Sequence, residues 1–189
     1  MNVRIEVESI ERLEEHAKIP AAFLVRRILA VSRENGGLGA FRLIESVVSS
    51  PWTKDYDAIS GEGPTHWRSQ FDISDWGLIA VYDGKTRVGG AVIAPDRKSK
   101  EAVLWDIRVR PESRSLGLGT ALFRSVEEWS RSTGCEILRI ETQDINVPAC
   151  RFYERNGCEL SSVDRLAYPD FPDETKLLWF KNLAPVSPN

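Results

Sequence analysis

The stretch Arg114-Ser115-Leu116-Gly117-Leu118-Gly119 joins a strand-like run, residues 103–109, to a strongly periodic helix. A glycine turn at the start of a helix exposes backbone N–H groups, and the helix dipole adds partial positive charge at the same point. Arg114 adds a full charge and a planar fork that suits phosphate oxygens. The stretch therefore predicts a phosphate-binding turn with backbone donors from Ser115 to Thr120.

Three better-known phosphate motifs do not fit this turn. A P-loop needs a Lys after its second glycine, and no Lys follows Gly119. A dinucleotide fingerprint needs a small third residue, and this chain has Leu122 there. A kinase glycine loop needs H-R-D and D-F-G partners, which the sequence lacks. What remains is R-x-x-G-x-G at a strand-to-helix turn.

The apolar pattern around the turn predicts a mixture of strands and helices. A first helix is predicted after the cap residue Ser9, a second from Leu118 to Gly134, and a third from the cap Asn146 to Gly157. Strands are predicted at residues 1–7, 41–48, 76–82, 87–94, 102–109, 136–141, 159–163 and 175–180. This layout favours an α+β fold, with a mixed and mostly antiparallel sheet flanked by helices.

Two segments before residue 65 are harder to interpret. Residues 22–31 fit neither period, and we prefer a hairpin that pairs them with residues 41–48 through Asn35-Gly36-Gly37. Residues 49–64 are rich in Ser, Pro, Gly and Asp, and we expect a long functional loop.

Length and composition indicate one soluble globular domain, residues 1–189, with its cofactor-binding part at about 75–181. Hydrophobic residues make up 42% and charged residues 28%. The net charge is −3 and no basic stripe appears, which argues against nucleic acid. There is no apolar run of about 18 residues, so no membrane span is expected. The odd, sparse cysteines predict reduced thiols and a cytoplasmic protein, and two histidines are too few for a His-based metal site.

A second motif follows the turn. It reads Asn146-Val147-Pro148-Ala149-Cys150-Arg151-Phe152-Tyr153-Glu154-Arg155-Asn156-Gly157. The turn and this motif together resemble the GNAT acetyltransferase superfamily, in which acyl coenzyme A is the phosphate ligand. Within it, residues 141–146, 163–168 and 51–56 resemble streptothricin (nourseothricin) acetyltransferases. The resemblance implies transfer of an acetyl group from acetyl coenzyme A to an amine by direct attack.

The same resemblance assigns residues to the cofactor. Backbone groups of Ile107, Arg108 and Val109 would pair with the pantetheine arm as an added strand does. The pyrophosphate would lie on the turn, held by Arg114, Ser115, Leu116, Gly117, Leu118, Gly119 and Thr120. Asn146, Ala149 and Phe152 would line the arm, although Asn146 also suits a helix cap.

Catalysis and acceptor binding are assigned to a second set. Tyr153 matches the family's general acid, and a phenol is protonated at neutral pH. Asp106 and Glu141 are candidate bases or attractors of a cationic amine, and water is the alternative base. Aromatic and acidic residues of the acceptor region, namely Trp52, Asp55, Tyr56 and Asp144, would bind a small cationic amine. Trp67 and Trp76 could join them, unless they belong to the core.

Three functions stay open at this point. The first is N-acetylation of a small cationic amine, with a streptothricin-like antibiotic as the specific expectation. The second is N-acetylation of a protein or a polyamine. The third, of a different class, is a non-catalytic acyl-coenzyme-A sensor that keeps the turn without the chemistry. A homodimer is compatible with the exposed sheet edges that such folds have.

Overall fold

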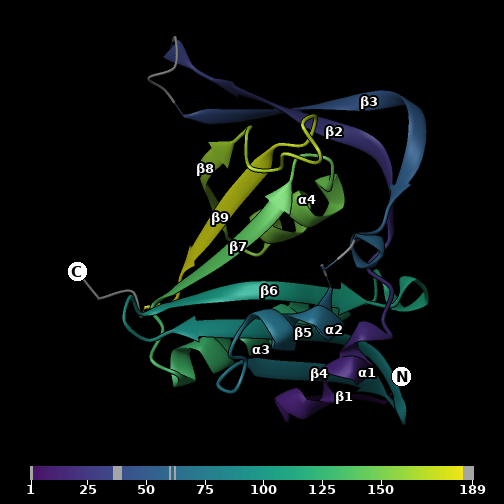
Figure 1. Ribbon diagram of the computed structural model, residues 1–189, viewed down its shortest axis with the longest axis vertical. Coiled ribbons are helices and arrows are strands. Elements are labelled where there is room, and N and C mark those ends of the chain that lie inside the picture. Colours follow the sequence, from purple (N-terminus) through teal and green to yellow (C-terminus); the bar gives the residue numbers. More distant parts are fainter. Residues whose placement is uncertain (1, 36–39, 60, 62, 185–189) are drawn as a thin grey trace. The chain divides into compact units, whose positions relative to one another are not determined.

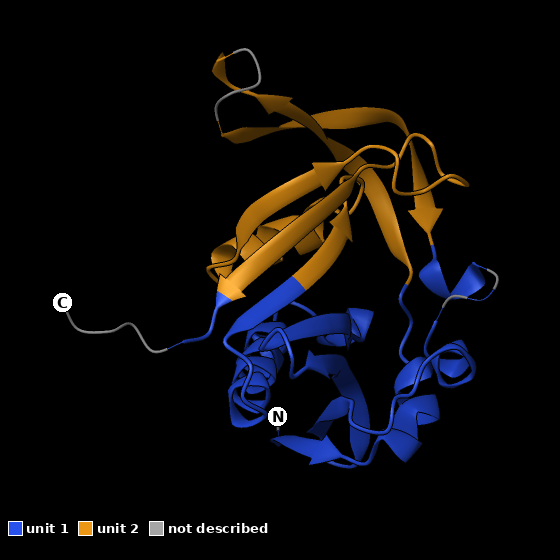
Figure 2. Ribbon diagram, turned by 60° about the vertical axis from the view of Figure 1, so that its left-hand side comes forward, with its two compact units in different colours: residues 1–21, 55–139, 182–189 blue, residues 22–54, 140–181 orange. Residues whose placement is uncertain are grey.

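The computed structural model describes residues 2–35, 40–59, 61 and 63–184. The chain divides into two compact units, each built from separate stretches of sequence (Figure 2). Unit 1 contains residues 1–21, 55–139 and 182–189, and unit 2 contains residues 22–54 and 140–181. That a single domain spans the whole chain stays a prediction.

Within its described residues, unit 1 contains an antiparallel sheet in the order β1-β4-β5-β6 (Figure 1). Its strands are β1 (Val3–Glu8), β4 (Gly77–Asp83), β5 (Thr86–Asp96) and β6 (Glu101–Val109). The strands predicted at residues 76–82 and 87–94 form a hairpin, because the β4–β5 register closes on the pair Asp83 and Thr86. Nearly all of β4 is buried, as expected of a strand that is covered on both faces.

A β-bulge interrupts β6 at Trp105. Val92 of β5 pairs with Asp106, whereas the next residue, Ile93, pairs with Leu104. Since neighbouring residues of a strand face opposite sides of a sheet, Leu104 and Asp106 also face opposite sides, although they are only two positions apart. The bulge therefore turns Asp106, and Arg108 after it, away from the face that Leu104 occupies.

Helix α3 (Leu118–Ser132) follows the glycine turn and lies against β4, β5 and β6. Its buried side chains include Leu118, Leu122 and Val126, which confirms the predicted apolar stripe. The predicted end is also confirmed, because Gly134 has a φ of 85° just beyond the helix. A Cβ atom at Gly77 would lie 2.5 Å from the Trp129 ring, so glycine lets β4 approach this helix closely.

Short helices complete unit 1. They are η1 (Ile10–Arg12), α1 (Leu13–Ala17), η3 (Tyr56–Ala58), α2 (Pro64–Gln70) and η4 (Pro111–Ser113). Ser9 caps η1 as predicted, since its side chain accepts a hydrogen bond from the Glu11 N–H. The buried cluster beneath α1 and α2 contains Leu13, Trp67, Ile73, Leu78 and Val92.

Unit 2 contains a long hairpin and a second group of strands. β2 (Phe23–Arg33) pairs antiparallel with β3 (Phe41–Lys54), which confirms the preferred hairpin. Of its predicted turn, Gly36 and Gly37 lie outside the described residues. The other strands are β7 (Ile137–Gln143), β8 (Glu159–Asp164) and β9 (Lys176–Asn182), in the order β7-β9-β8, and α4 (Val147–Arg155) follows β7. The predicted α+β class with a mostly antiparallel sheet is confirmed.

The predicted loop at residues 49–64 is wrong in its first part, because β3 continues to Lys54. The register passes from the pair Arg27 and Val47 to the pair Val25 and Trp52. Residues 48–51 therefore lie opposite Arg26 alone. Pro51, which has no N–H to donate, falls in this irregular part and leaves the ladder on either side intact. Pairing with β2 explains why a turn-like composition nevertheless forms a strand.

Candidate functional site

The predicted phosphate turn lies at the N-terminus of α3. Gly117 is the N-cap, with a φ of 79°, and Ser115 also has a positive φ, 64°. The first helical hydrogen bond runs from the Ala121 N–H to the Gly117 carbonyl, at 3.1 Å. The N–H groups of residues 118–120 thus precede the helical ladder and have no intrahelical acceptor. A helix start of this kind binds anions.

Space and charge at the turn both suit a bulky anion. A Cβ atom at Gly117 would meet nothing within 4 Å, and Leu116 is 55% exposed. Arg114 donates from Nε to the Val109 carbonyl at 3.0 Å, which holds the guanidinium between the end of β6 and the turn. That bond does not use the two terminal nitrogens of Arg114. The residues present therefore fit the pyrophosphate that the sequence predicts there.

The side chain of Arg108 is part of a buried charge network. Its Nη1 and Nη2 donate to the two oxygens of Asp57 at 2.7 and 2.8 Å, and Nη1 also donates to the Ile19 carbonyl at 3.0 Å. Its Nε donates to Oδ2 of Asp106, and His16 Nε2 lies 3.1 Å from the same oxygen. From the sequence, only the backbone of Arg108 was predicted to have a role. The network of its side chain was not predicted.

Asp106 keeps its charge in this network. Burial alone would raise the pKa of its carboxyl, but the hydrogen bond and the charge interaction with His16, followed by those with Arg108, outweigh burial and hold that pKa below its ordinary value. A carboxylate with a lowered pKa is a weaker proton acceptor. The surroundings of Asp106 thus favour an anion that attracts a cation over one that takes up a proton.

One sequence signal could have revealed the network. Gly89-Gly90 interrupts an otherwise apolar strand, and glycine inside a strand often marks a close approach. A Cβ atom at Gly90 would lie 2.6 Å from His16 Nδ1, so this glycine makes room for the imidazole. The bulge at Trp105 left no comparable signal, and without it Asp106 and Arg108 would face the other side of the sheet.

The predicted residues on β7 and α4 lie in unit 2. Glu141 accepts a hydrogen bond from the Tyr168 hydroxyl at 2.7 Å and pairs with Lys176 at 3.1 Å. Asn146 caps α4 through a hydrogen bond from the Ala149 N–H, which confirms its capping role. Tyr153 is 5% exposed, and its ring lies 5.3 Å from that of Phe152.

Unit 2 also contains a pocket of about 390 Å³ that we call the acidic pocket. It is lined by Ile28, Trp52, Asp144, Ile145, Asp170, Phe171, Pro172, Asp173 and Glu174. The lining contains four carboxylates and two aromatic rings, and no Lys, Arg or His. It brings together two of the predicted acceptor residues, Trp52 and Asp144. The other two lie in unit 1, where Tyr56 begins η3 and Asp55 caps it by accepting a hydrogen bond from the Asp57 N–H.

One residue of the chain, Lys54, already places its ammonium group against an acidic and an aromatic residue of this pocket. Lys54 Nζ lies 2.6 Å from Glu174 Oε1 and 3.5 Å from the centre of the Phe171 ring. Both side chains of the ion pair are almost buried, at 9% and 13% exposed. In contrast, no ion pair within the described ranges involves Asp144, Asp170 or Asp173. Burial raises the pKa of Asp144, as expected of a carboxylate without a cationic partner.

The other aromatic candidates form a cluster in unit 1. Trp67 is 6% exposed and belongs to the hydrophobic core, so its suggested place in an acceptor pocket is wrong. Trp76 packs against the same core and lies 4.7 Å from Trp105, measured between ring centres. Phe71 stacks on Trp76.

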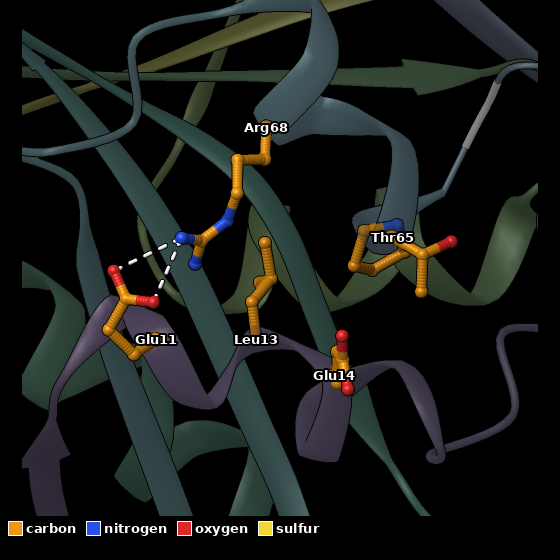
Figure 3. Close-up of a pocket in the computed structure, with 6 residues that line it drawn as sticks. Glu11, Leu13, Glu14, Thr65 and Arg68 are labelled. Atoms are coloured by element: carbon orange, nitrogen blue, oxygen red, sulfur yellow. Dashed lines mark hydrogen bonds and ion pairs between the residues drawn. The ribbon is translucent and has the colours of Figure 1, made fainter.

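Unit 1 also has a pocket of about 280 Å³, between the η1–α1 segment and α2. Figure 3 shows Arg68 reaching across it to Glu11, with hydrogen bonds of 2.9 and 3.1 Å. Leu13 lines its floor, and Glu14 and Thr65 stand at its rim. None of the predicted site residues lines this pocket.

Comparison with known proteins gives this arrangement its context. The profile of the Acetyltransferase (GNAT) family matches residues 42–158, which include both sequence motifs. The chain belongs to the GNAT acetyltransferase family. Membership confirms the predicted fold and enzyme class, with acetyl coenzyme A as co-substrate. The individual roles of the GNAT site residues stay predictions.

Individual relatives agree with the predicted resemblance. Streptothricin acetyltransferase A of Bacillus subtilis (strain 168) is 37% identical over 81 residues, which cover 42% of this chain and 47% of that protein, so this match spans about half of its length. A streptothricin acetyltransferase of Escherichia coli is 28% identical over 173 residues, 90% of this chain and 91% of that protein. The crystal structure of nourseothricin acetyltransferase has a TM-score of 0.78 at 24% identity, covers 97% of this chain and 100% of its own, and shows a shared fold.

The structure also bears on the expected absence of a membrane span. Among the helices formed by the described residues, none has the length and apolar character needed to cross a bilayer.

Proposed function

We propose that this GNAT protein transfers an acetyl group from acetyl coenzyme A to a primary amine of a small cationic acceptor of the streptothricin type. The observation that carries the proposal is the acidic pocket. Three of its four carboxylates take part in no ion pair among the described residues, and together with the Trp52 ring they favour positively charged ligands, because carboxylates attract ammonium groups and ring faces bind them by cation–π interaction. Relatives named streptothricin acetyltransferase support the same acceptor class.

The geometry around Lys54 supports an ammonium ligand in particular. An ammonium already lies over Phe171 and against Glu174. Asp144, Asp170 and Asp173 are left for further positive charge. An acceptor with more than one amine would therefore satisfy the pocket better than a single ammonium.

The donor is proposed to bind in unit 1. The N–H groups at the start of α3 and the guanidinium of Arg114 would hold the pyrophosphate. The β6 backbone at Ile107–Val109 would hold the arm, as the resemblance implies. Acetyl coenzyme A supplies a thioester carbonyl that a neutral amine attacks.

Two proton movements accompany the transfer. The acceptor ammonium must lose a proton, and Glu141 or water is the better candidate for it, because the pKa of Asp106 is lowered. The departing thiolate gains a proton, for which we propose Tyr153. A phenol of ordinary acidity is protonated at neutral pH and able to donate.

A thiol-release assay with acetyl coenzyme A tests the proposal. The panel contains streptothricin, a polyamine and a peptide with a free N-terminus, and we expect the highest kcat/KM with streptothricin. Asp173→Asn should raise the KM for that acceptor several-fold, whereas Glu128→Gln, which removes an exposed carboxylate on α3, should not.

The other outcomes separate the alternatives. Preference for the peptide or the polyamine would favour the second function. A rise in Tm with acetyl coenzyme A, without thiol release on any amine, would favour the sensor.

A further inference from the structure

The carboxylate of Asp106 is held from one side only. His16 Nε2 and Arg108 Nε both donate to Oδ2, and no hydrogen bond within the described residues ends on Oδ1. The side chain is 14% exposed, so it is not sealed from ligands. Two donors on one oxygen fix the plane of the carboxylate and leave the other oxygen with its lone pairs unused.

His16 orients Asp106 and is too deeply buried to contact a ligand itself. Its side chain is completely buried, and Nδ1 has no hydrogen-bond partner. Because Nε2 faces a carboxylate, the ring carries a proton on this nitrogen and donates a hydrogen bond to Asp106. Gly90 leaves the space that the ring needs. His16 therefore leaves one buried nitrogen, Nδ1, without a hydrogen-bond partner while Nε2 orients the carboxylate. An apolar side chain at this position would leave no such unpaired atom, but it could not orient Asp106.

The charges that face Asp106 come from each neighbouring element. α1 provides His16, β6 provides Arg108, and η3 provides Asp57, which reaches Asp106 through the guanidinium. Asp106 and Asp57 share this one guanidinium, and the second oxygen of Asp106 can still accept a hydrogen bond from a further cation.

We propose that His16 is a positioning residue which, together with Arg108, holds Asp106 as a fixed anion whose Oδ1 binds the amine of the acceptor. The inference rests on the proposed function and assigns Asp106 to amine binding, so that Asp106 does not take up the proton. The lowered pKa of Asp106 agrees with a carboxylate that stays ionised through the cycle. No bond to Asp106 forms or breaks: the amine donates a hydrogen bond to Oδ1 and is released with the product.

Two substitutions at His16 test this role. Gln places an amide nitrogen near the position of Nε2 and keeps the donor, whereas Met fills the space without one. We expect His16→Met to raise the KM for the amine about 10-fold, the equivalent of one hydrogen bond to a charged group. The kcat and the KM for acetyl coenzyme A should stay within about twofold, and His16→Gln should resemble the wild type.

Gly90→Ala provides an independent test, because the new methyl group, 2.6 Å from His16 Nδ1 and 3.0 Å from the Ile79 carbonyl oxygen, would displace the imidazole while His16 itself is kept. It should reproduce the KM effect of His16→Met, so the prediction can be checked even if the Met variant does not fold. Wild-type kinetics in both variants would overturn the inference.

The pH dependence of kcat/KM shows whether Asp106 binds the amine as an anion or takes up its proton as a base. If Asp106 were the base, His16→Met would lower kcat and move the acidic limb of the kcat/KM profile to higher pH, and this outcome would also overturn the inference. A wild-type protein that releases no thiol with any amine would overturn the proposed function and this inference together. An active wild type with unchanged variants overturns the inference alone.

Discussion

Arg108 donates hydrogen bonds from both terminal nitrogens to the carboxylate of Asp57, at 2.7 and 2.8 Å, and the two residues are 51 positions apart in the sequence. A two-point ion pair fixes distance and angle together, which a single contact cannot do. It ties η3 to the sheet strand β6, and the bond from Arg108 to the Ile19 carbonyl adds the segment after α1. Three separate stretches of unit 1 therefore depend on one guanidinium, which is 6% exposed.

Removing this guanidinium should be costly. Arg108→Met keeps an unbranched apolar stem but removes the guanidinium that pairs with two carboxylates, and we expect the free energy of unfolding to fall by about 3 kcal/mol. Arg68→Met is a matched control in the same unit, because Arg68 pairs with Glu11 at the exposed surface. That change should cost no more than about 0.5 kcal/mol. Urea unfolding of both variants measures the difference, and equal losses would contradict a buried clamp.

The turn at Gly117 allows a test with a built-in control. Gly117 and Gly84 both have a positive φ and open space where a Cβ would lie. Alanine at either position should cost about 1 kcal/mol of backbone strain. Only Gly117→Ala should also weaken acetyl coenzyme A binding, by about 10-fold, because its methyl group would meet the pyrophosphate. Calorimetric titration measures this, and equal affinities for the two variants would argue against a phosphate site at the turn.

Local sequence patterns were sufficient to predict the cofactor half of the molecule. The apolar stripe of Leu118, Leu122 and Val126 identified α3, and Gly134 identified the end of this helix. Both signals are local, because the helical period and the capping residues depend only on residues close in sequence. Asn146 identified the start of α4 for the same reason. The family resemblance then supplied the ligand, which no local pattern could name.

Features that depend on distant partners were not predictable. Trp52 and Lys54 lie in a strand, despite their turn-like neighbours, because β2 pairs with them. Asp106 was predicted as a base or an attractor of a cationic amine, but its contact with His16 was not, since only the bulge and the approach of α1 bring the two together. The acidic pocket joins β2, β3 and two later loops, so its carboxylates could not be grouped from sequence spacing.

Tyr153→Phe tests the proposed general acid. Removing the hydroxyl should lower kcat about 100-fold, within the usual contribution of general acid catalysis, with little change in the KM for acetyl coenzyme A. Tyr82→Phe is the control, because the Tyr82 hydroxyl also donates a hydrogen bond, to Glu8, and Tyr82 is not one of the predicted site residues. Steady-state kinetics from pH 6 to 9 measure both variants. A kcat for Tyr153→Phe that matches the control at every pH would remove the acid role.

The buried thiols should be chemically silent. Burial raises the pKa of Cys150 to about 11, so at pH 8 only about one thiol in a thousand is the reactive thiolate. Cys135 and Cys158 are also buried. We expect no labelling by iodoacetamide in the native protein and complete labelling in urea, read by mass spectrometry. Rapid native labelling of Cys150 would contradict this expectation.

Asp144 should show that the acidic pocket binds cations at the expense of stability. Burial raises its pKa in the folded protein, so its contribution to stability is complete below the unfolded pKa of about 3.9 and is lost as pH rises through the folded pKa. Asp144→Asn stays neutral and can still accept the hydrogen bond from the Thr175 N–H. We therefore expect this variant to have a higher Tm than the wild type at pH 7, with the difference shrinking towards pH 4.

The same variant should lose function while it gains stability, because a neutral amide attracts an ammonium less than a carboxylate does. Its KM for the cationic acceptor should rise, with the KM for acetyl coenzyme A unchanged. Asp170→Asn serves as the control for the change in Tm. Asp170 lines the same pocket but is exposed, so the Tm of this variant should equal that of the wild type. If Asp144→Asn lowered the Tm at pH 7, the carboxylate would be stabilising the fold, and its place in the acceptor pocket would need another explanation.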